Sequence, residues 1–286
     1  MTKCCYIVFK PPNNKKIEAE DDTEELKLVL NGTILKRVTH TKFLGVTIDE
    51  NLDWEQHIKD LKRKLYHSLS TLSYMRKHVP SELLKDLYYT LFESHLTYCI
   101  SSWGSSSNKL DSLHIIQKKA VRILFGDVEK FKEKFKTCVR TRSIEKQTLG
   151  SEFYLKEHTK PLFKTHEILA VPNLYYYHTF METFKLFKFR SPLSLIGNYE
   201  FSRRECLNHI SIIPPPPDKS FIYQSSVIWN TVRSKLSISD LSISTEVVKK
   251  RVRDAIFFNQ HRHSLTDWIS THDFDLKNIE NKSKNN

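Results

Sequence analysis

The chain has few of the residues that build phosphate loops, metal frameworks or membrane spans. Only 6 of its 286 residues are glycine, and GxGxxG, P-loop, GxSxG and HExxH motifs are absent, which argues against nucleotide cradles and common hydrolase centres. Its 5 cysteines form no CxxC pair, so a reducing compartment is favoured over a zinc ribbon or disulfide framework. No apolar stretch approaches the roughly 20 residues of a spanning helix. We therefore expect an intracellular protein, in the nucleus or cytoplasm, with no membrane partner.

Positive charge is the main compositional signal. Lysine and arginine number 45 against 33 acidic residues, which gives a formal net charge of +12 and a pI near 9.3. This balance favours a polyanionic partner, nucleic acid before a membrane surface. Hydrophobic residues make up 39% and aromatic residues 12% of the chain, so disorder throughout is not expected and a core can form.

The hydrophobic pattern changes from strand-like to helical near residue 50. CYIVF, LKLVL, TILKRV and FLGVTI read as short strands, and Asn31-Gly32 predicts a two-residue hairpin turn. Asp53 and Gln56 resemble a capping box. After them, apolar residues recur at spacings of three and four and predict an amphipathic helix; they are Trp54, Ile58, Leu61, Leu65, Leu69 and Leu72.

Further helices are expected along the rest of the chain. One helix should begin at Pro80 and run to the SSWGSSS sequence, with an apolar face that includes Leu83 and Leu84, and another should span 108–125. Two helical pieces should flank Pro172, and a last helix should cover 245–258. Pro214 to Pro217 should form a polyproline II spacer. These patterns predict an α+β fold, a small antiparallel hairpin region followed by mostly helical structure.

Two sets of carboxylates come closest to a metal site. Adjacent aspartates such as Asp21-Asp22 can bind two Mg²⁺ ions, but this pair lies among six acids between Glu18 and Glu25, which is typical of a solvated loop. Asp49 ends a strand without a partner carboxylate on a neighbouring strand end, so we interpret it as a turn residue. The pairs Cys206/His209 and His261/His263 each offer two ligands, too few for structural zinc. We assign no catalytic or metal-binding residue.

Basic residues give a stronger signal than the acids. The first predicted helix carries Lys59, Lys62, Arg63 and Lys64 opposite its apolar stripe, and residues 118–146 hold ten basic residues against four acids. Such residues contact a phosphate backbone without reading its sequence. An ordinary solvated helix face is the alternative interpretation, and the net charge favours nucleic acid.

Several motifs together resemble one protein family. KFLGVTIDENLDWEQHI, SHLTYCISSWGSSSNKLDSLHIIQKKAVRILFG, PLFKTHEILAVPNLYYYHTFMETFKLFK and SSVIWNTV resemble the carboxy-terminal part of non-LTR, jockey-like retrotransposon reverse transcriptases. The resemblance covers about 2–258 in the family's order.

The resemblance implies a division of the chain and a set of contact residues. Residues 1–50 would be a palm remnant with a primer-grip-like hairpin, 51–126 a helical thumb, 127–263 a mostly helical extension and 264–286 a polar tail. Lys42, Phe43, Leu44 and Gly45 would form the grip, where the missing Cβ of Gly45 would allow nucleic acid or another strand to approach closely. The expected backbone contacts are Lys59, Lys62, Arg63, Lys118, Lys119 and Arg122.

The resemblance also implies what the chain does not supply. The family's catalytic aspartates lie upstream of the segment that matches Thr2, so we expect this chain alone to be inactive and to hold no cofactor, although the full-length family uses Mg²⁺. An RNA–DNA or DNA duplex is the expected partner, together with an upstream polymerase half.

A second hypothesis is a helical protein-interaction module that derives from a retroelement and has no role with nucleic acid. Its partner-binding face would use the aromatic residues Tyr175, Tyr176, Tyr177, Phe180, Phe184 and Phe187. Burial of these residues in a core is the favoured interpretation.

Overall fold

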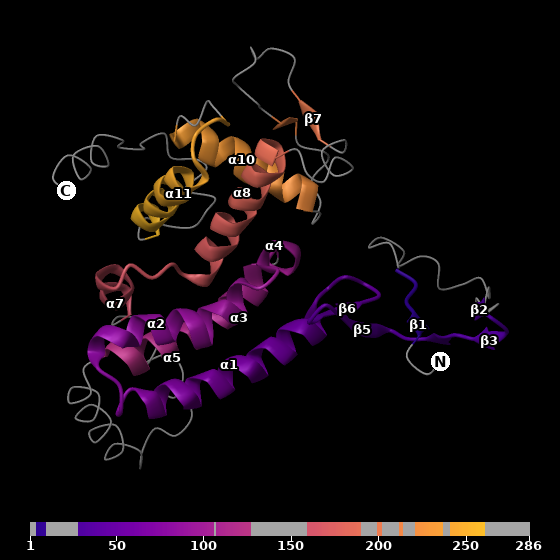
Figure 1. Cartoon of the computed structure of the whole chain (residues 1–286), viewed down its shortest axis with the longest axis horizontal. Helices are drawn as coiled ribbons and strands as arrows, with labels where there is room; N and C mark the ends of the chain where they lie inside the picture. The colour runs from indigo at the N-terminus through magenta and orange to yellow at the C-terminus, as the bar shows by residue number, and fades with distance from the viewer. Residues whose placement is uncertain are drawn as a thin grey trace, which may run out of the picture. The chain divides into compact units, whose positions relative to one another are not determined.

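The computed structural model describes residues 4–9, 28–105, 107–126, 159–189, 199–201, 212–213, 221–236 and 241–260. Helices and short two-stranded sheets make up these residues, so the predicted α+β class is confirmed (Figure 1). The chain forms two compact units, Met1–Leu65 (the amino-terminal unit) and Tyr66–Asn286 (the carboxy-terminal unit). The domain limits expected after residues 50, 126 and 263 stay predictions. Outside the described residues lie Asp21-Asp22, the basic stretch 127–147, Cys206, His209, Pro214 to Pro217, His261, His263 and the tail.

Small strand pairs form the amino-terminal unit. Strand β1 (Cys5–Tyr6) pairs in parallel with β4 (Lys36–Arg37), whereas β2 (Val29–Leu30) and β3 (Thr33–Ile34) form an antiparallel hairpin. The φ angles of Asn31 and Gly32 are 49° and 73°, which confirms the predicted two-residue turn.

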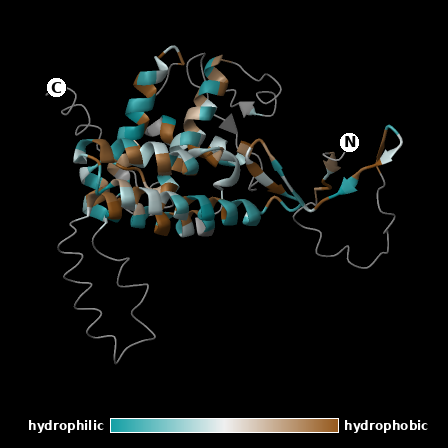
Figure 2. Ribbon diagram, turned by 60° about the horizontal axis from the view of Figure 1, so that its bottom comes forward, coloured by the Kyte–Doolittle hydropathy of each residue, from teal (hydrophilic) through white to brown (hydrophobic). Residues whose placement is uncertain are grey.

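A second hairpin leads into the first helix. Strands β5 (His40–Phe43) and β6 (Val46–Asp49) pair in antiparallel register, and α1 (Glu55–Met75) follows. The predicted apolar stripe of α1 is confirmed, because Ile58, Leu61, Leu65, Leu69 and Leu72 are all buried. Figure 2 shows the resulting mixture of hydrophobic and hydrophilic residues along the helices.

The segment after Pro80 is not the single helix that the sequence predicts. It consists of η1 (Ser81–Leu83), α2 (Leu84–Tyr88), a π-helical turn η2 (Tyr89–Glu93), α3 (Ser94–Thr97) and α4 (Ile100–Trp103). Leu83 is also half exposed, at 50%, rather than part of an apolar face.

The spacing of buried side chains explains these interruptions. Tyr88, Phe92, Leu96 and Ile100 follow one another at intervals of four and are all fully buried. In an α-helix four residues advance roughly 40° beyond one turn, so three such steps would rotate the last side chain away from the core. The wider π turn and the break at Cys99, whose φ is 52°, keep the four side chains on one buried face.

Of the later helices, α5 (Ser107–Phe125) and α11 (Thr245–Asn259) agree closely with their predictions. The break expected at Pro172 lies a few residues earlier, and α10 (Phe221–Leu236) was not predicted as a helix. Helix α5 begins one residue before the predicted start. Helices α7 (Lys160–Thr165) and α8 (Val171–Phe189) lie on either side of residues 166–170, and Pro172 occupies the first turn of α8. Strands β7 (Glu200–Phe201) and β8 (Ile212–Ile213) pair, and helices α10 and α11 follow.

Helix α8 is the centre of the carboxy-terminal unit and contacts α3, α4, α5, α10 and α11 (Figure 1). Around Trp229 of α10, the ring centroids of Phe180, Phe184 and Phe187 lie 5.2, 6.5 and 5.1 Å away. These phenylalanines and Tyr175 are buried. These four residues therefore form a core, as the sequence favoured, whereas Tyr176 and Tyr177 of the same predicted face are partly exposed.

A buried glutamine joins α5 to two other segments. Gln117 is fully buried, and its Nε2 donates hydrogen bonds to Tyr88 Oη at 2.8 Å and to the Leu169 carbonyl at 2.7 Å. Its Oε1 accepts a bond from the Val171 amide at 3.0 Å. Because its polar atoms are paired, Gln117 can be buried without a large desolvation cost.

Candidate nucleic-acid interface

The predicted grip residues form the tip of the β5–β6 hairpin. Phe43 pairs with Val46, so Leu44 and Gly45 are the turn residues, with φ angles of 45° and 86°. Two positive φ values in succession match a type I′ turn. The prediction of 43–48 as one strand is therefore wrong, because the chain reverses inside it. Gly45 also has a conformational role that the sequence prediction did not include, since glycine adopts positive φ without strain.

The hairpin tip offers both apolar surface and charge to solvent. Phe43 is 60% exposed and Leu44 75% exposed, and Lys42 beside them is exposed as well. A lysine next to apolar side chains can pair with a phosphate while its neighbours contact sugar or base. The tip thus presents one cation and two apolar side chains to solvent.

Hydrogen bonds from Thr47 join the β5–β6 hairpin to the start of α1. The Thr47 backbone N–H donates to His57 Nδ1 at 3.3 Å, and the Thr47 hydroxyl donates to Asp60 Oδ2 at 3.2 Å. Burial, and then the charge of Lys64, lower the pKa of His57, so the imidazole is a neutral acceptor at physiological pH. The helix therefore determines the orientation of strand β6.

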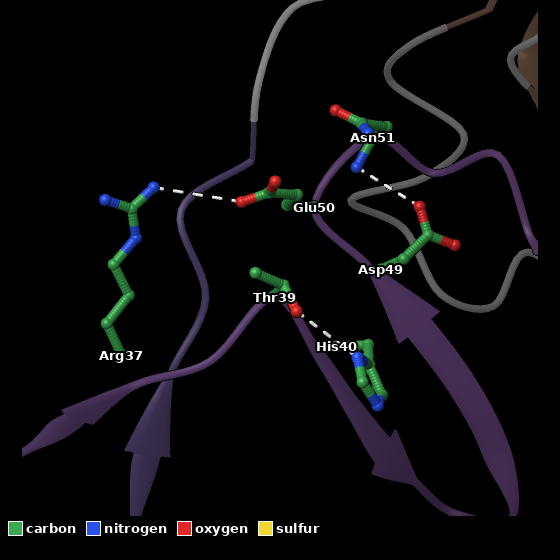
Figure 3. A network of polar contacts seen from close by, with 6 residues as sticks. All are labelled: Arg37, Thr39, His40, Asp49, Glu50 and Asn51. Carbon is green, nitrogen blue, oxygen red and sulfur yellow. Dashed lines mark hydrogen bonds and ion pairs between the residues drawn. The ribbon is translucent and has the colours of Figure 1, made fainter. Parts of the chain in front are cut away.

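Asp49 organises the corner between β6 and α1. Its carboxylate accepts backbone N–H bonds from Asn51 at 3.2 Å, Asp53 at 3.0 Å and Trp54 at 2.8 Å. The bond to Asn51 is drawn in Figure 3, beside the Arg37–Glu50 ion pair. The interpretation of Asp49 as a turn residue rather than a metal ligand agrees with these bonds, which use both oxygens.

Asp53 caps the helix in a simpler way than predicted. Its Oδ1 accepts a hydrogen bond from the Glu55 N–H at 2.9 Å, which satisfies one free donor of the first turn. A capping box would also have the Asp53 N–H donate to the Gln56 side chain. In this described corner the Asp53 N–H donates to Asp49 instead, and the Gln56 side chain donates to Asp60.

The basic residues of α1 differ in how they are paired. Lys59 and Arg63 are exposed and Lys62 is partly exposed. Arg63 forms an ion pair with Asp60 at 3.1 Å, whereas neither lysine has an ion pair with a carboxylate in the described part of the chain. Lys59 and Lys62 are therefore more available to a phosphate than Arg63.

A second basic group, Lys118, Arg122 and Lys160, forms where α5 packs against α7; we call it the α5–α7 cluster. Burial, followed by the charges of Arg122 and Lys160, lowers the pKa of Lys118, while Asp111 acts in the opposite direction. Burial also lowers the pKa of Arg122. Among the described residues, none of the three has a carboxylate within ion-pair distance. The cluster is thus a group of three cations without a direct ion pair, and Asp111 offsets part of its charge.

Lys119 lies on another face of α5, next to an aromatic ring. Its Nζ is 5.5 Å from the ring centroid of Tyr66 on α1, a distance that allows a cation–π interaction. The six predicted backbone-contact residues are therefore not one set: those of α5 divide between the α5–α7 cluster and the Tyr66 contact.

Sequence reasoning missed Lys160 and Tyr66 as members of these groups. Tyr66 could have been found, because it follows Arg63 by three residues on the polar side of α1. Lys160 could not, because no pattern in the sequence predicts that α7 packs on α5.

One buried carboxyl stands apart from the basic groups. Glu93 lies in the π turn, where burial raises its pKa to about 7, although Arg253 and Tyr88 oppose this shift. Its Oε2 has no hydrogen-bond partner among the described residues. Because this raised pKa differs from that of an unfolded glutamate, Glu93 contributes to the pH dependence of stability.

The described residues contain no group of three or more His, Cys, Asp or Glu side chains that could hold a metal ion. No helix in the described ranges combines the length and apolar character that crossing a bilayer needs. Comparisons of the chain with protein-family models, with curated proteins and with solved structures give no significant match.

Proposed function

We propose that the chain is the primer–template-binding part of a non-LTR retrotransposon reverse transcriptase, a truncated RNA-directed DNA polymerase without the catalytic aspartates. It holds an RNA–DNA or DNA duplex and does not by itself catalyse synthesis. The observation that carries the proposal is the α5–α7 cluster, in which Lys118, Arg122 and Lys160 lie near one another and none forms an ion pair with a carboxylate of the described residues.

The electrostatics of this cluster favour an anionic partner. Bringing cations together in a partly buried place costs free energy, as the lowered pKa of Lys118 reflects. A phosphate at the same place would remove that cost and would accept hydrogen bonds from the guanidinium of Arg122. A nucleic-acid backbone supplies such groups at regular intervals.

The amino-terminal unit supports the same function through different residues. The type I′ tip presents Lys42, Phe43 and Leu44, and the first turns of α1 present Lys59 and Lys62. The bonds from Thr47 to His57 and Asp60 hold the hairpin against the helix. A rigidly held, exposed tip is what gripping a primer end requires.

A salt-dependent binding measurement tests the proposal. Fluorescence anisotropy with a labelled RNA–DNA duplex, repeated from about 50 to 200 mM salt, should show tight binding at low salt and a steep decline. The variant Lys118→Gln/Arg122→Gln should bind more weakly with every duplex sequence. The slope of log affinity against log salt should become shallower by roughly 2, since each phosphate contact contributes about 0.9.

The matched control is Lys250→Gln/Arg251→Gln, which removes the same charge from exposed positions on α11. It should change the slope by less than half as much as the cluster variant. Absence of duplex binding at 50 mM salt would refute the proposal, and so would equal slopes for the cluster variant and the control.

A further inference from the structure

Helix α1 carries exposed tyrosines in a stretch that has no acidic residue. Between Asp60 and Glu82 the sequence contains no aspartate or glutamate. Within this stretch Tyr66 is 49% exposed and Tyr74 is 65% exposed. Eight residues separate them, which is roughly 12 Å along a helix, and an offset of about 80° keeps both rings on the same side of α1.

Each of these tyrosine rings lies next to a lysine or histidine side chain. The Lys119 Nζ lies 5.5 Å from the Tyr66 centroid. The imidazole of His78 lies 4.6 Å from the ring of Tyr74, centroid to centroid, and Lys77 beside it is exposed. Neither ring belongs to the core, and neither takes part in the α5–α7 cluster.

We propose that Tyr66 and Tyr74 form a stacking platform for unpaired nucleotides, with Lys119 and Lys77 as contacts to the phosphates between them. The ligand is single-stranded RNA or DNA that continues from the bound duplex, so the platform rests on the proposed function and extends it to the unpaired strand.

The chemistry of the surface selects this ligand over a protein segment. Aromatic side chains interleaved with cations bind single strands because every base has a stacking face and every nucleotide a phosphate. Tyrosine is also common at protein interfaces, but the exposed residues beside Tyr74 in the sequence are all polar or basic: Ser70, Ser73, Lys77 and His78. The lack of acidic residues also favours a polyanion.

The test compares a labelled oligonucleotide of about 12 thymidines with an abasic oligonucleotide of equal length and charge. The full chain should bind the thymidine probe at least fivefold more tightly than the abasic one. Tyr66→Ala and Tyr74→Ala should each weaken thymidine binding roughly fivefold or more. Tyr66→Phe/Tyr74→Phe should retain affinity within about twofold, because the stacking surface is kept.

Tyr98→Ala is the matched control, since Tyr98 is 51% exposed but does not lie on α1, and it should leave binding unchanged. Equal affinity for the abasic probe, or full binding by both alanine variants, would overturn the platform. The RNA–DNA duplex is measured alongside. If the chain binds the duplex but binds the thymidine and abasic probes equally, the platform alone is refuted. If it prefers the thymidine probe but does not bind the duplex, the proposed function alone is refuted.

Discussion

The strands of the amino-terminal unit and the helices of the carboxy-terminal unit use their apolar side chains in different ways. In the amino-terminal unit, Val29, Ile34 and Leu44 are 60%, 65% and 75% exposed. In the carboxy-terminal unit, Trp229 and Phe180 are at most 1% exposed. The carboxy-terminal unit therefore has a buried aromatic core that stabilises it. The strands of the amino-terminal unit are held mainly by backbone hydrogen bonds, and their apolar side chains face solvent.

Under the proposed function, the two units would contribute in different ways. A unit with a dense core can keep basic residues such as Lys118 and Arg122 in fixed positions. Under the proposed function, the exposed Phe43–Leu44 tip would contact nucleic acid. The following substitutions test whether the two units really differ in this way.

The largest effect is expected at the centre of the core. Trp229→Ala removes the ring that three phenylalanines contact and should lower the free energy of unfolding by about 3–5 kcal/mol. Ile34→Ala, at an exposed position, should change it by less than about 0.5 kcal/mol. Urea unfolding followed by far-ultraviolet circular dichroism measures both, and comparable losses would contradict the comparison.

A smaller effect concerns the pH dependence of the carboxy-terminal unit. Burial raises the pKa of Glu93 from 4.5 to about 7, so the folded state binds more protons than the unfolded state between these pH values. The free energy of unfolding should therefore fall as pH rises through this window, by about 3 kcal/mol at most. Glu93→Gln cannot ionise and should lack this fall.

The difference between wild type and Glu93→Gln is the useful measurement for this site. Burial lowers the pKa of His114 and His178 to about 4, so both histidines make stability rise with pH over part of the same range. Their contribution is the same in wild type and in Glu93→Gln, so it cancels in the difference between the two stability curves. Parallel stability curves from pH 4 to 8 would show that Glu93 does not titrate near neutrality.

The charged and polar side chains that influence the pKa of Glu93, or are influenced by its charge, are Arg253, Tyr88, Tyr89 and Tyr177.

The hairpin tip should show a local effect of about 1–2 kcal/mol. Gly45→Ala places a Cβ at a φ of 86°, which costs roughly that amount in the left-handed region. Leu44→Asn should act in the opposite direction, because asparagine tolerates the φ of 45° at Leu44 better than leucine does. Hydrogen exchange of the Thr47 amide reports on both, and equal exchange in the two variants would rule out strain at the turn.

The smallest effect is expected at the surface ion pair of the amino-terminal unit. Arg37 and Glu50 lie 3.8 Å apart, with 44% and 17% of their side-chain surface exposed. A double-mutant cycle with Arg37→Ala and Glu50→Ala should give a coupling below about 1 kcal/mol that decreases with salt. A larger, salt-insensitive value would mean that this unit is held together by charge.

Local patterns in the sequence predicted much of the fold. The spacing from Ile58 to Leu72 predicted the buried face of α1, and Asn31-Gly32 predicted its turn, because in both cases the deciding interactions join residues close in sequence. The apolar pattern missed the turn at Leu44-Gly45, because leucine is unfavourable at positive φ and 43–48 reads as one strand, although the resemblance implied a hairpin here. The π turn was missed because its cause is burial against other helices.

The candidate interface was predictable only in part. Charge and helical phase identified Lys59, Lys62, Lys118 and Arg122 as exposed or partly exposed cations, but not their partners. The ion pair of Arg63, the position of Lys160 beside Lys118, and the contact of Lys119 with Tyr66 depend on side-chain geometry or on packing between segments distant in sequence. Tertiary contacts of this kind leave no periodic pattern.

The corner around Asp49 has a consequence for the order of folding. Its three hydrogen bonds join residues no more than five positions apart, whereas Phe180 and Trp229 must meet across nearly fifty residues. Short loops close in roughly 10–100 ns, far faster than distant segments find each other. The link between hairpin and helix can therefore form before any core exists, and pulse-labelled exchange should show the Asp53 and Trp54 amides protected ahead of those in α10.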